Sequence, residues 1–344
     1  MSSPAPAHSP YLAVRDEWLA KRTEPALLPD LPIIDPHHHL WDRPDWRYLI
    51  DDLAADLGQG HNIAATVFVQ CRAMHRASGP EAFRPVGETE FVAGIAAMSE
   101  SGGYGSTRIA AGIVGHVDLR HGRLARDVLQ AHLAVGGGRF RGIRHIAAWD
   151  EDADILNPAY QPPRDMFYSD DFRAGFAQLA PLGLSFDAWL YHRQIPDLAA
   201  LARAFPGTPI ILDHVGGPLG IGRYTSQRDA VFAEWKTGIQ DLARCANVVV
   251  KLGGLGMRIG GFGFENGVLP PSSDELAAAW KPYIETCIDA FGADRCMFQS
   301  NFPVDKGSYG YGVFWNACKK LAARASAAEQ AALFHDTAAR VYRI

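Results

Sequence analysis

Short apolar runs rich in β-branched residues alternate with longer amphipathic stretches along almost the whole chain. This alternation is typical of repeated βα units around a parallel sheet, whose strands are covered on both faces and are apolar throughout. We expect strands at residues 32–37, 64–70, 110–114, 140–145, 184–190, 209–214, 247–252 and 295–300. Eight such strands predict a single (β/α)8 TIM barrel of the α/β class, with an open doubly wound sheet as the alternative.

Between the strands, apolar residues recur at three- and four-residue spacing, as on the buried face of an amphipathic helix. We expect helices at residues 88–98, 124–135, 171–180, 196–204, 228–243 and 274–290. The glycine-rich segments 99–105 and 253–271 have no such period and are predicted to be loops. Because the second of these is long and follows a strand, we expect it to act as a lid over a functional site.

The length and composition fit one globular domain. The chain has 344 residues, of which 48% are hydrophobic and 21% charged, and a barrel of roughly 250 residues with insertions is normally one domain. We expect the barrel at residues 32–344, with an N-terminal arm at residues 1–31 packed on it. No apolar run reaches the roughly 18 residues that a membrane-spanning helix needs, and the first ten residues lack the pattern of a signal peptide.

Charge and cysteine usage narrow the class of partner. The net charge is −5 with both signs interspersed, so there is no basic stripe for nucleic acid. An odd count of five cysteines without C-x-x-C spacing argues against a disulfide framework and favours a reducing compartment. We therefore expect a cytoplasmic protein that binds a small-molecule substrate, with no nucleic-acid or membrane partner. Assembly into a homo-oligomer is left open.

Polar side chains follow the predicted strands at the end where TIM barrels carry their active sites. The first strand ends in His37-His38-His39, and alternate side chains share a face, so His37 and His39 point into the barrel mouth together. Two imidazoles so placed can share one zinc ion, with His192 or His214 as a third ligand and an open position for water. The alternative is a polar cap on the strand without a metal.

His214 stands where the sixth strand stops and a glycine-rich turn begins. An imidazole, whose ordinary pKa lies near 6.5, suits a general acid or base or a group that polarises a carbonyl. A buried structural histidine is the alternative. At the end of the fifth strand, Tyr191 is a candidate for substrate binding, and His192 is either a metal ligand or a surface residue.

Basic residues at strand ends are candidates for binding an anionic part of the substrate. Arg141 and Arg144 point to opposite faces of one strand, and we choose Arg144, beside His145, to hold a carboxylate because its guanidinium suits bidentate recognition. Arg72, just after the second strand, is the competing candidate. Lys251, at the end of the seventh strand, either bonds within the mouth or neutralises an acidic ligand. For each of them an ion pair within the protein is the alternative.

Several other kinds of site are disfavoured. The glycine-rich segments 216–220 and 253–256 are not followed by Lys-Ser/Thr and do not form a dinucleotide fingerprint, so we interpret them as turns. The chain has no G-x-S-x-G elbow and no cysteine within a nucleophile motif, which disfavours covalent acyl-enzyme chemistry.

Four segments together resemble the amidohydrolase-related family of the amidohydrolase superfamily. They are Asp-Pro-His-His-His-Leu-Trp-Asp at 35–42, Leu-Asp-His-Val-Gly at 212–216, Val-Lys-Leu-Gly at 250–253 and Cys-Met-Phe-Gln-Ser-Asn-Phe-Pro-Val-Asp at 296–305. The likeness runs from about residue 32 to the C-terminus and is nearest to the lactonase-like branch, which includes 2-pyrone-4,6-dicarboxylate lactonase and sugar lactonases. It implies that His37 and His39 are the first-strand metal pair and that His214 is the sixth-strand histidine.

The chain departs from this family at the eighth strand, where the family's aspartate falls on Asn301. An amide cannot act as a base, so Asp305, His214 or His192 is left for that role. The fourth strand offers no lysine for a two-metal centre, and the resemblance implies one divalent metal, with Zn2+ as first choice, or none. It implies a hydrolase that opens a lactone or related cyclic ester, with a carboxylate-bearing ring as one candidate. A non-oxidative decarboxylase of an aromatic or muconic acid and an inactive binding barrel are the alternatives.

Overall fold

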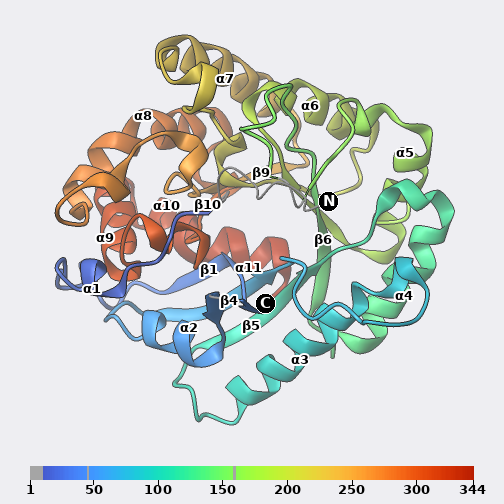
Figure 1. Cartoon of the computed structure of the whole chain (residues 1–344), viewed down its shortest axis with the longest axis horizontal. Coiled ribbons are helices and arrows are strands. Elements are labelled where there is room, and N and C mark those ends of the chain that lie inside the picture. Colours follow the sequence, from blue (N-terminus) through green and yellow to red (C-terminus); the bar gives the residue numbers. More distant parts are fainter. Residues whose placement is uncertain (1–10, 45, 158–159) are drawn as a thin grey trace, which may run out of the picture.

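The computed structural model of the chain describes residues 11–44, 46–157 and 160–344. Its centre is a parallel sheet of eight strands, and helices form a ring around them (Figure 1). In their order around the sheet the strands are β1 (Ile33–His38), β4 (Ile63–Val69), β5 (Arg108–Gly115), β6 (Phe140–Ile146), β7 (Ser185–Trp189), β8 (Ile210–Leu212), β9 (Val248–Leu252) and β10 (Cys296–Phe298). Each predicted strand is confirmed, with ends that differ by at most two residues.

The sheet closes through the segment that follows β10. His38 and Phe302 form a parallel bridge, the amide of Asn301 donates to the carbonyl of His37 at 3.0 Å, and the amide of His39 donates to the carbonyl of Phe302 at 2.8 Å. The predicted (β/α)8 TIM barrel is therefore confirmed, and the open sheet is wrong.

The six predicted helices are present as α3 (Val86–Glu100), α4 (Ala125–Val135), α5 (Asp170–Phe176), α6 (Ile195–Ala204), α7 (Arg228–Leu242) and α8 (Ser273–Phe291). Further elements were not predicted: α1 (Asp16–Leu19), α2 (Ile50–Leu57), α9 (Tyr311–Leu321), α10 (Ala327–Ala331), α11 (Thr337–Tyr342) and a hairpin of β2 (Trp41–Arg43) and β3 (Trp46–Tyr48). Residues 253–271 carry only short 3-10 turns, as expected for a loop.

Helix α11 closes the amino-terminal end of the barrel. Tyr342 packs inside the barrel with Val67, Ile211 and Val249, and its hydroxyl donates to Asp187 at 2.7 Å. These apolar side chains fill the interior from below, as they do in other TIM barrels. The predicted site residues lie at the opposite end of the barrel, at the carboxyl ends of the strands.

The described part of the N-terminal arm, residues 11–31, lies against the loop at 253–271 and against α9. The indole of Trp18 donates to the carbonyl of Gly267 at 3.0 Å, and the amide of Leu27 donates to the side chain of Asn316 at 2.8 Å. Residues 1–10 of the predicted arm lie outside the described residues, and the boundary at residue 31 stays a prediction.

All five cysteines are buried and free. Within the part of the chain that the structure describes, none of the helices is both long and apolar enough to span a bilayer.

Candidate active site

A cavity of about 90 Å3 opens at the carboxyl ends of the strands. Its position is the one at which TIM barrels bind their substrates. Its polar lining includes His39, Arg144, Asp154, Asn157, Tyr191, His214, Arg258 and Asn301, and its aromatic lining includes Trp41, Tyr160 and Trp189. Strand ends and the loops after them thus supply polar groups to one small, partly apolar space.

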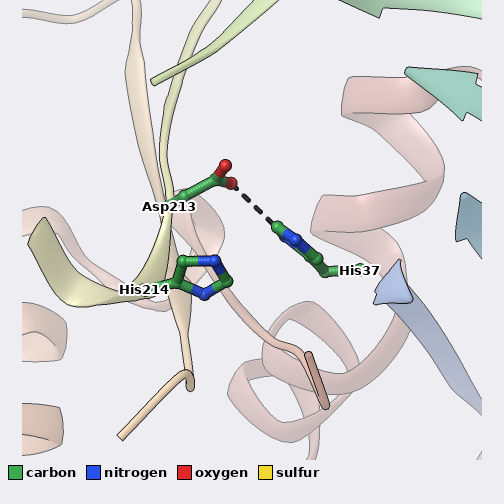
Figure 2. Close-up of side chains that lie close together, drawn as sticks. All are labelled: His37, Asp213 and His214. Carbon is green, nitrogen blue, oxygen red and sulfur yellow. Dashed lines mark ion pairs between the residues drawn. The ribbon is translucent and has the colours of Figure 1, made fainter. Parts of the chain in front are cut away.

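His37, Asp213 and His214 form a buried cluster beside this cavity (Figure 2). One ligand atom from each lies within 4.8 Å of the others, and Nδ1 of His37 lies 3.5 Å from Oδ1 of Asp213. His37 comes from β1, whereas Asp213 and His214 directly follow β8. Two imidazoles and a carboxylate are a donor set that zinc accepts in catalytic sites.

Burial keeps these histidines neutral. It lowers the pKa of His37, His39 and His214 well below 6.5, and the ammonium of Lys251 lowers the pKa of His37 further. A neutral imidazole has a nitrogen lone pair that can bind a metal or accept a proton. At neutral pH each of the three rings therefore carries one nitrogen lone pair.

The carboxylate of Asp213 supports a cation at this cluster. It is fully buried, and among the described residues neither of its oxygens has a hydrogen-bond partner. Its nearest cation is Lys251, with Nζ at 3.2 Å, but Lys251 lies closer to Asp187, at 2.6 Å. A buried carboxylate that accepts no hydrogen bond and shares its one cation with Asp187 is poorly compensated for its lost hydration. The residues present therefore fit a divalent ion held by His37, Asp213 and His214.

Lys251 lies beneath the site and does not line the cavity. Its ammonium joins Asp187, Asp213 and Nδ1 of His37, the last at 3.2 Å. Burial raises the pKa of Asp187, and the Lys251 charge opposes that shift. This network, to which the hydroxyl of Tyr342 also donates, holds the first-strand histidine from below. The structure therefore places the predicted substrate-binding lysine in a supporting position.

His39 faces the cavity with one nitrogen fixed. Its ring centroid lies 4.9 Å from that of His37, and its Nδ1 lies 2.7 Å from the carbonyl oxygen of Val69. A carbonyl only accepts, so Nδ1 carries the proton and Nε2 keeps its lone pair. The predicted pair on the first strand does converge, but the close cluster is completed by Asp213 and His214.

His192 does not join this group. It lies in a 3-10 turn after β7, with its ring 5.5 Å from that of Tyr224 and Nε2 3.8 Å from a carboxylate oxygen of Glu234. Neighbouring Tyr191 does line the cavity, and its hydroxyl donates to the carbonyl of Ile155 at 3.0 Å.

His214 is held tightly in an uncommon backbone conformation. Its φ is +54°, and Nε2 of Gln299 lies 2.9 Å from its Nδ1. A β-carbon on Gly254 would lie only 2.5 Å from the same nitrogen. Left-handed conformations at residues other than glycine persist where the surroundings enforce them, and they gather at functional sites. The imidazole is thus fixed in place by its neighbours.

Asn301 lines the cavity, and Asp305 lies behind it. The Asn301 amide donates to Oδ1 of Asp305 at 2.7 Å, which leaves the amide oxygen free to accept. Asp305 is fully buried, and its other oxygen accepts from the hydroxyl of Tyr309 at 2.6 Å and the amide of Gly256 at 3.1 Å. Burial raises the pKa of Asp305 to about 7. Asp305 is therefore placed to orient Asn301, and it does not line the cavity.

Two arginines line the cavity. Arg144 donates to the carbonyl of Gln70, and its Nη1 lies 3.3 Å from Nε2 of His37. The side chain of Arg258, on the loop at 253–271, has no hydrogen bond or ion pair within the described ranges of the chain, although its backbone carbonyl accepts from the amide of Gly261 at 3.1 Å. The other predicted anion-binding residues, Arg72 and His145, line a neighbouring cavity instead.

Sequence reasoning gave no role to three residues of the site. Asp187 interrupts an apolar strand, and Asp213 directly precedes the predicted His214. A buried carboxylate inside such a strand needs a partner, and that requirement was a usable signal. Arg258 carried no such signal, because only the folded loop brings it to the cavity.

The chain is similar to known proteins over most of its length. The sequence profile of the amidohydrolase family matches residues 34–344. The uncharacterized protein y4mH of Sinorhizobium fredii is 34% identical over 92% of this chain and 99% of its own length. An L-fucono-1,5-lactonase of Burkholderia multivorans is 29% identical over 90% and 96% of the two chains.

Among solved structures, an amidohydrolase from Burkholderia multivorans superposes with a TM-score of 0.70 at 28% identity, covering 91% of this chain and 99% of its own. It has been crystallised with bound HEPES and, in another crystal form, with bound zinc. With a family match over most of its length, a TIM barrel and a histidine-rich site at the strand ends, this chain belongs to the amidohydrolase family and is a hydrolase of small molecules.

Proposed function

We propose that this hydrolase opens a lactone that carries a carboxylate, by adding water to the ring carbonyl. One observation carries the proposal: the cavity brings neutral His39 and His214 together with Arg144 and Arg258. A neutral imidazole can move a proton to or from water, and a guanidinium binds a carboxylate through paired hydrogen bonds. The likeness to an L-fucono-1,5-lactonase supports a cyclic ester as substrate.

Side chains that line the cavity have separate roles in the proposed reaction. Arg258 and Arg144 bind the carboxylate and so orient the ring. Nε2 of His39, whose lone pair is fixed by the bond from Nδ1 to Val69, accepts a proton from the attacking water. The amide oxygen of Asn301, oriented by Asp305, accepts a hydrogen bond from that water. Asn301 thus positions water without acting as the base.

His37, Asp213 and His214 would hold one divalent ion, with zinc as the first choice for two nitrogens and one carboxylate oxygen. When bound, such an ion acts as a Lewis acid that lowers the pKa of water and polarises a carbonyl. Binding of zinc by a relative at 28% identity supports the choice of metal.

The test is ring opening by the purified full-length chain on a panel of neutral and carboxylate-bearing lactones, followed by proton release, with metal content measured on the same sample. We expect turnover of carboxylate-bearing lactones that falls on chelation and returns with zinc. His39→Gln should lose at least a hundredfold in kcat. The matched variant His335→Gln, which lies between α10 and α11 and does not line the cavity, should not change kcat. No turnover of any lactone by metal-loaded protein would refute the proposal.

A further inference from the structure

A second cavity, of about 630 Å3, lies next to the first one, where the loops after β4, β5 and β6 meet. These strands are neighbours in the barrel (Figure 1). Ile146 and Tyr160 line both cavities and so form the wall between them. The proposed reaction uses none of the polar side chains that face this larger space.

The lining of the second cavity is predominantly basic. Four arginines and four histidines face it, against the carboxylates of Glu81 and Asp118. Arg120 pairs with Asp118 at 2.7 Å, and Arg76 pairs with Glu90 outside the lining. The four arginines set against Glu81, Asp118 and Glu90, with the histidines neutral, leave one net positive charge. The guanidinium of Arg84 has no ion pair in the described part of the chain, and the one side-chain hydrogen bond it makes there is long, 3.4 Å, to the carbonyl of Gly79.

His145 is the most deeply buried of the four histidines. It is 5% exposed, and among the described residues neither ring nitrogen has a hydrogen-bond partner. Its nearest charged group is Asp118, with Oδ1 3.5 Å from Nε2, and its ring lies 5.4 Å from that of His116. Burying a polar ring without a hydrogen-bond partner costs free energy. A ligand with hydrogen-bonding groups would supply the missing partner.

The same features argue against a bound cation. The described His, Cys, Asp and Glu side chains give one cluster close enough to hold a metal, which is the one at His37. Four guanidinium groups would repel a metal ion. Guanidinium and imidazole N–H groups instead provide the donors that phosphate and carboxylate oxygens accept.

We propose that the second cavity binds the phosphate or carboxylate group of a small organic anion, with Arg84, Arg120 and the histidines as donors. That anion is either a distant part of the substrate, reaching past Tyr160, or a separate molecule. In both cases the two cavities share strand β6, because Arg144 lines the first cavity, His145 is the adjacent residue, and the Arg144 carbonyl contacts Nδ1 of His116 at 3.2 Å.

Calorimetric titration of inorganic phosphate and of pyrophosphate into the full-length chain, at constant ionic strength, tests the site directly. We expect saturable binding at one site per chain, weakened at least tenfold in Arg84→Gln and in His145→Gln. The matched variant Arg324→Gln removes an exposed arginine that does not line the cavity, and it should bind as the parent does. Thermal unfolding checks each variant for folding, and exposed Arg84 keeps the test valid if His145→Gln does not fold.

Absence of saturable binding, or equal weakening in Arg324→Gln, would overturn the inference. Steady-state kinetics with phosphate present then show whether the bound anion is part of the substrate or a separate ligand. Competitive inhibition of ring opening that Arg84→Gln relieves identifies part of the substrate, whereas binding without competition identifies a separate ligand. Because the titration needs no turnover, it decides the anion site even if the proposed lactone hydrolysis fails.

Discussion

Replacing Arg258 by methionine separates recognition of the substrate's carboxylate from the chemical step. The side chain of Arg258 faces the cavity and has no polar partner in the described part of the protein. Its removal should therefore change the free energy of unfolding by no more than about 0.5 kcal/mol, as at ordinary surface positions. Its proposed partner is the substrate, and a hydrogen bond to a charged group contributes about 1.5–3 kcal/mol.

That energy corresponds to a loss of about 10- to 150-fold in kcat/KM on a carboxylate-bearing lactone. A neutral lactone of the same ring size gives Arg258 nothing to bind, so its kcat/KM should change by less than about threefold. Proton release during ring opening measures both substrates in one assay, and Arg324→Met provides a matched control. Equal losses on the two lactones, or no loss on either, would refute the assignment of Arg258 to the carboxylate.

Three further perturbations test the site. Burial raises the pKa of the Asp305 carboxyl from 3.8 to about 7. As pH rises, this carboxyl therefore ionises in the unfolded chain before it ionises in the folded one. Between pH 4 and 7 it lowers the free energy of unfolding by about 4 kcal/mol in all. Urea unfolding at pH 5 and pH 8 should show a smaller loss of stability with rising pH in Asp305→Asn than in the parent; an identical pH dependence would contradict the burial argument. Gly254→Ala places a β-carbon 2.5 Å from the His214 ring at φ +73°, and a displaced imidazole should cost on the order of 100-fold in kcat. The control Gly94→Ala, where no atom lies within 4 Å of the new carbon, should keep full activity, and equal activity of the two variants would show that the ring is not held as described. Asp213→Asn should lower the zinc content of purified protein at least tenfold, and unchanged zinc would exclude this cluster as the metal site.

The barrel was predictable because each strand is a short apolar run between polar turns. Continuous burial on both faces leaves a local signal that sequence reasoning can detect. Closure was only partly predictable, since it depends on backbone bonds between the segment after β10 and β1, which are distant in sequence. Helix α11 was missed although Tyr342 and Ala338 close the barrel, because it is short and follows a π-turn that breaks the helical period.

The candidate site was also predictable only in part. His37, His39 and His214 were predictable because each ends a strand. The polar groups that surround these histidines were not predictable, because contacts across the barrel depend on the register of the strands and on which face each strand end presents. Asp305 shows this limit: it follows the eighth strand closely, yet its carboxylate points to Tyr309 and Gly256 and not to the cavity.

The proposed function requires that water adds to a lactone carbonyl at the barrel mouth. Single turnover in water enriched in 18O distinguishes this addition from decarboxylation when the product is analysed by mass spectrometry and the headspace is analysed for CO2. Addition of water should place one 18O atom in the new carboxylate of a ring-opened product and release no CO2. Release of CO2, or ring opening without 18O in the carboxylate, would contradict it.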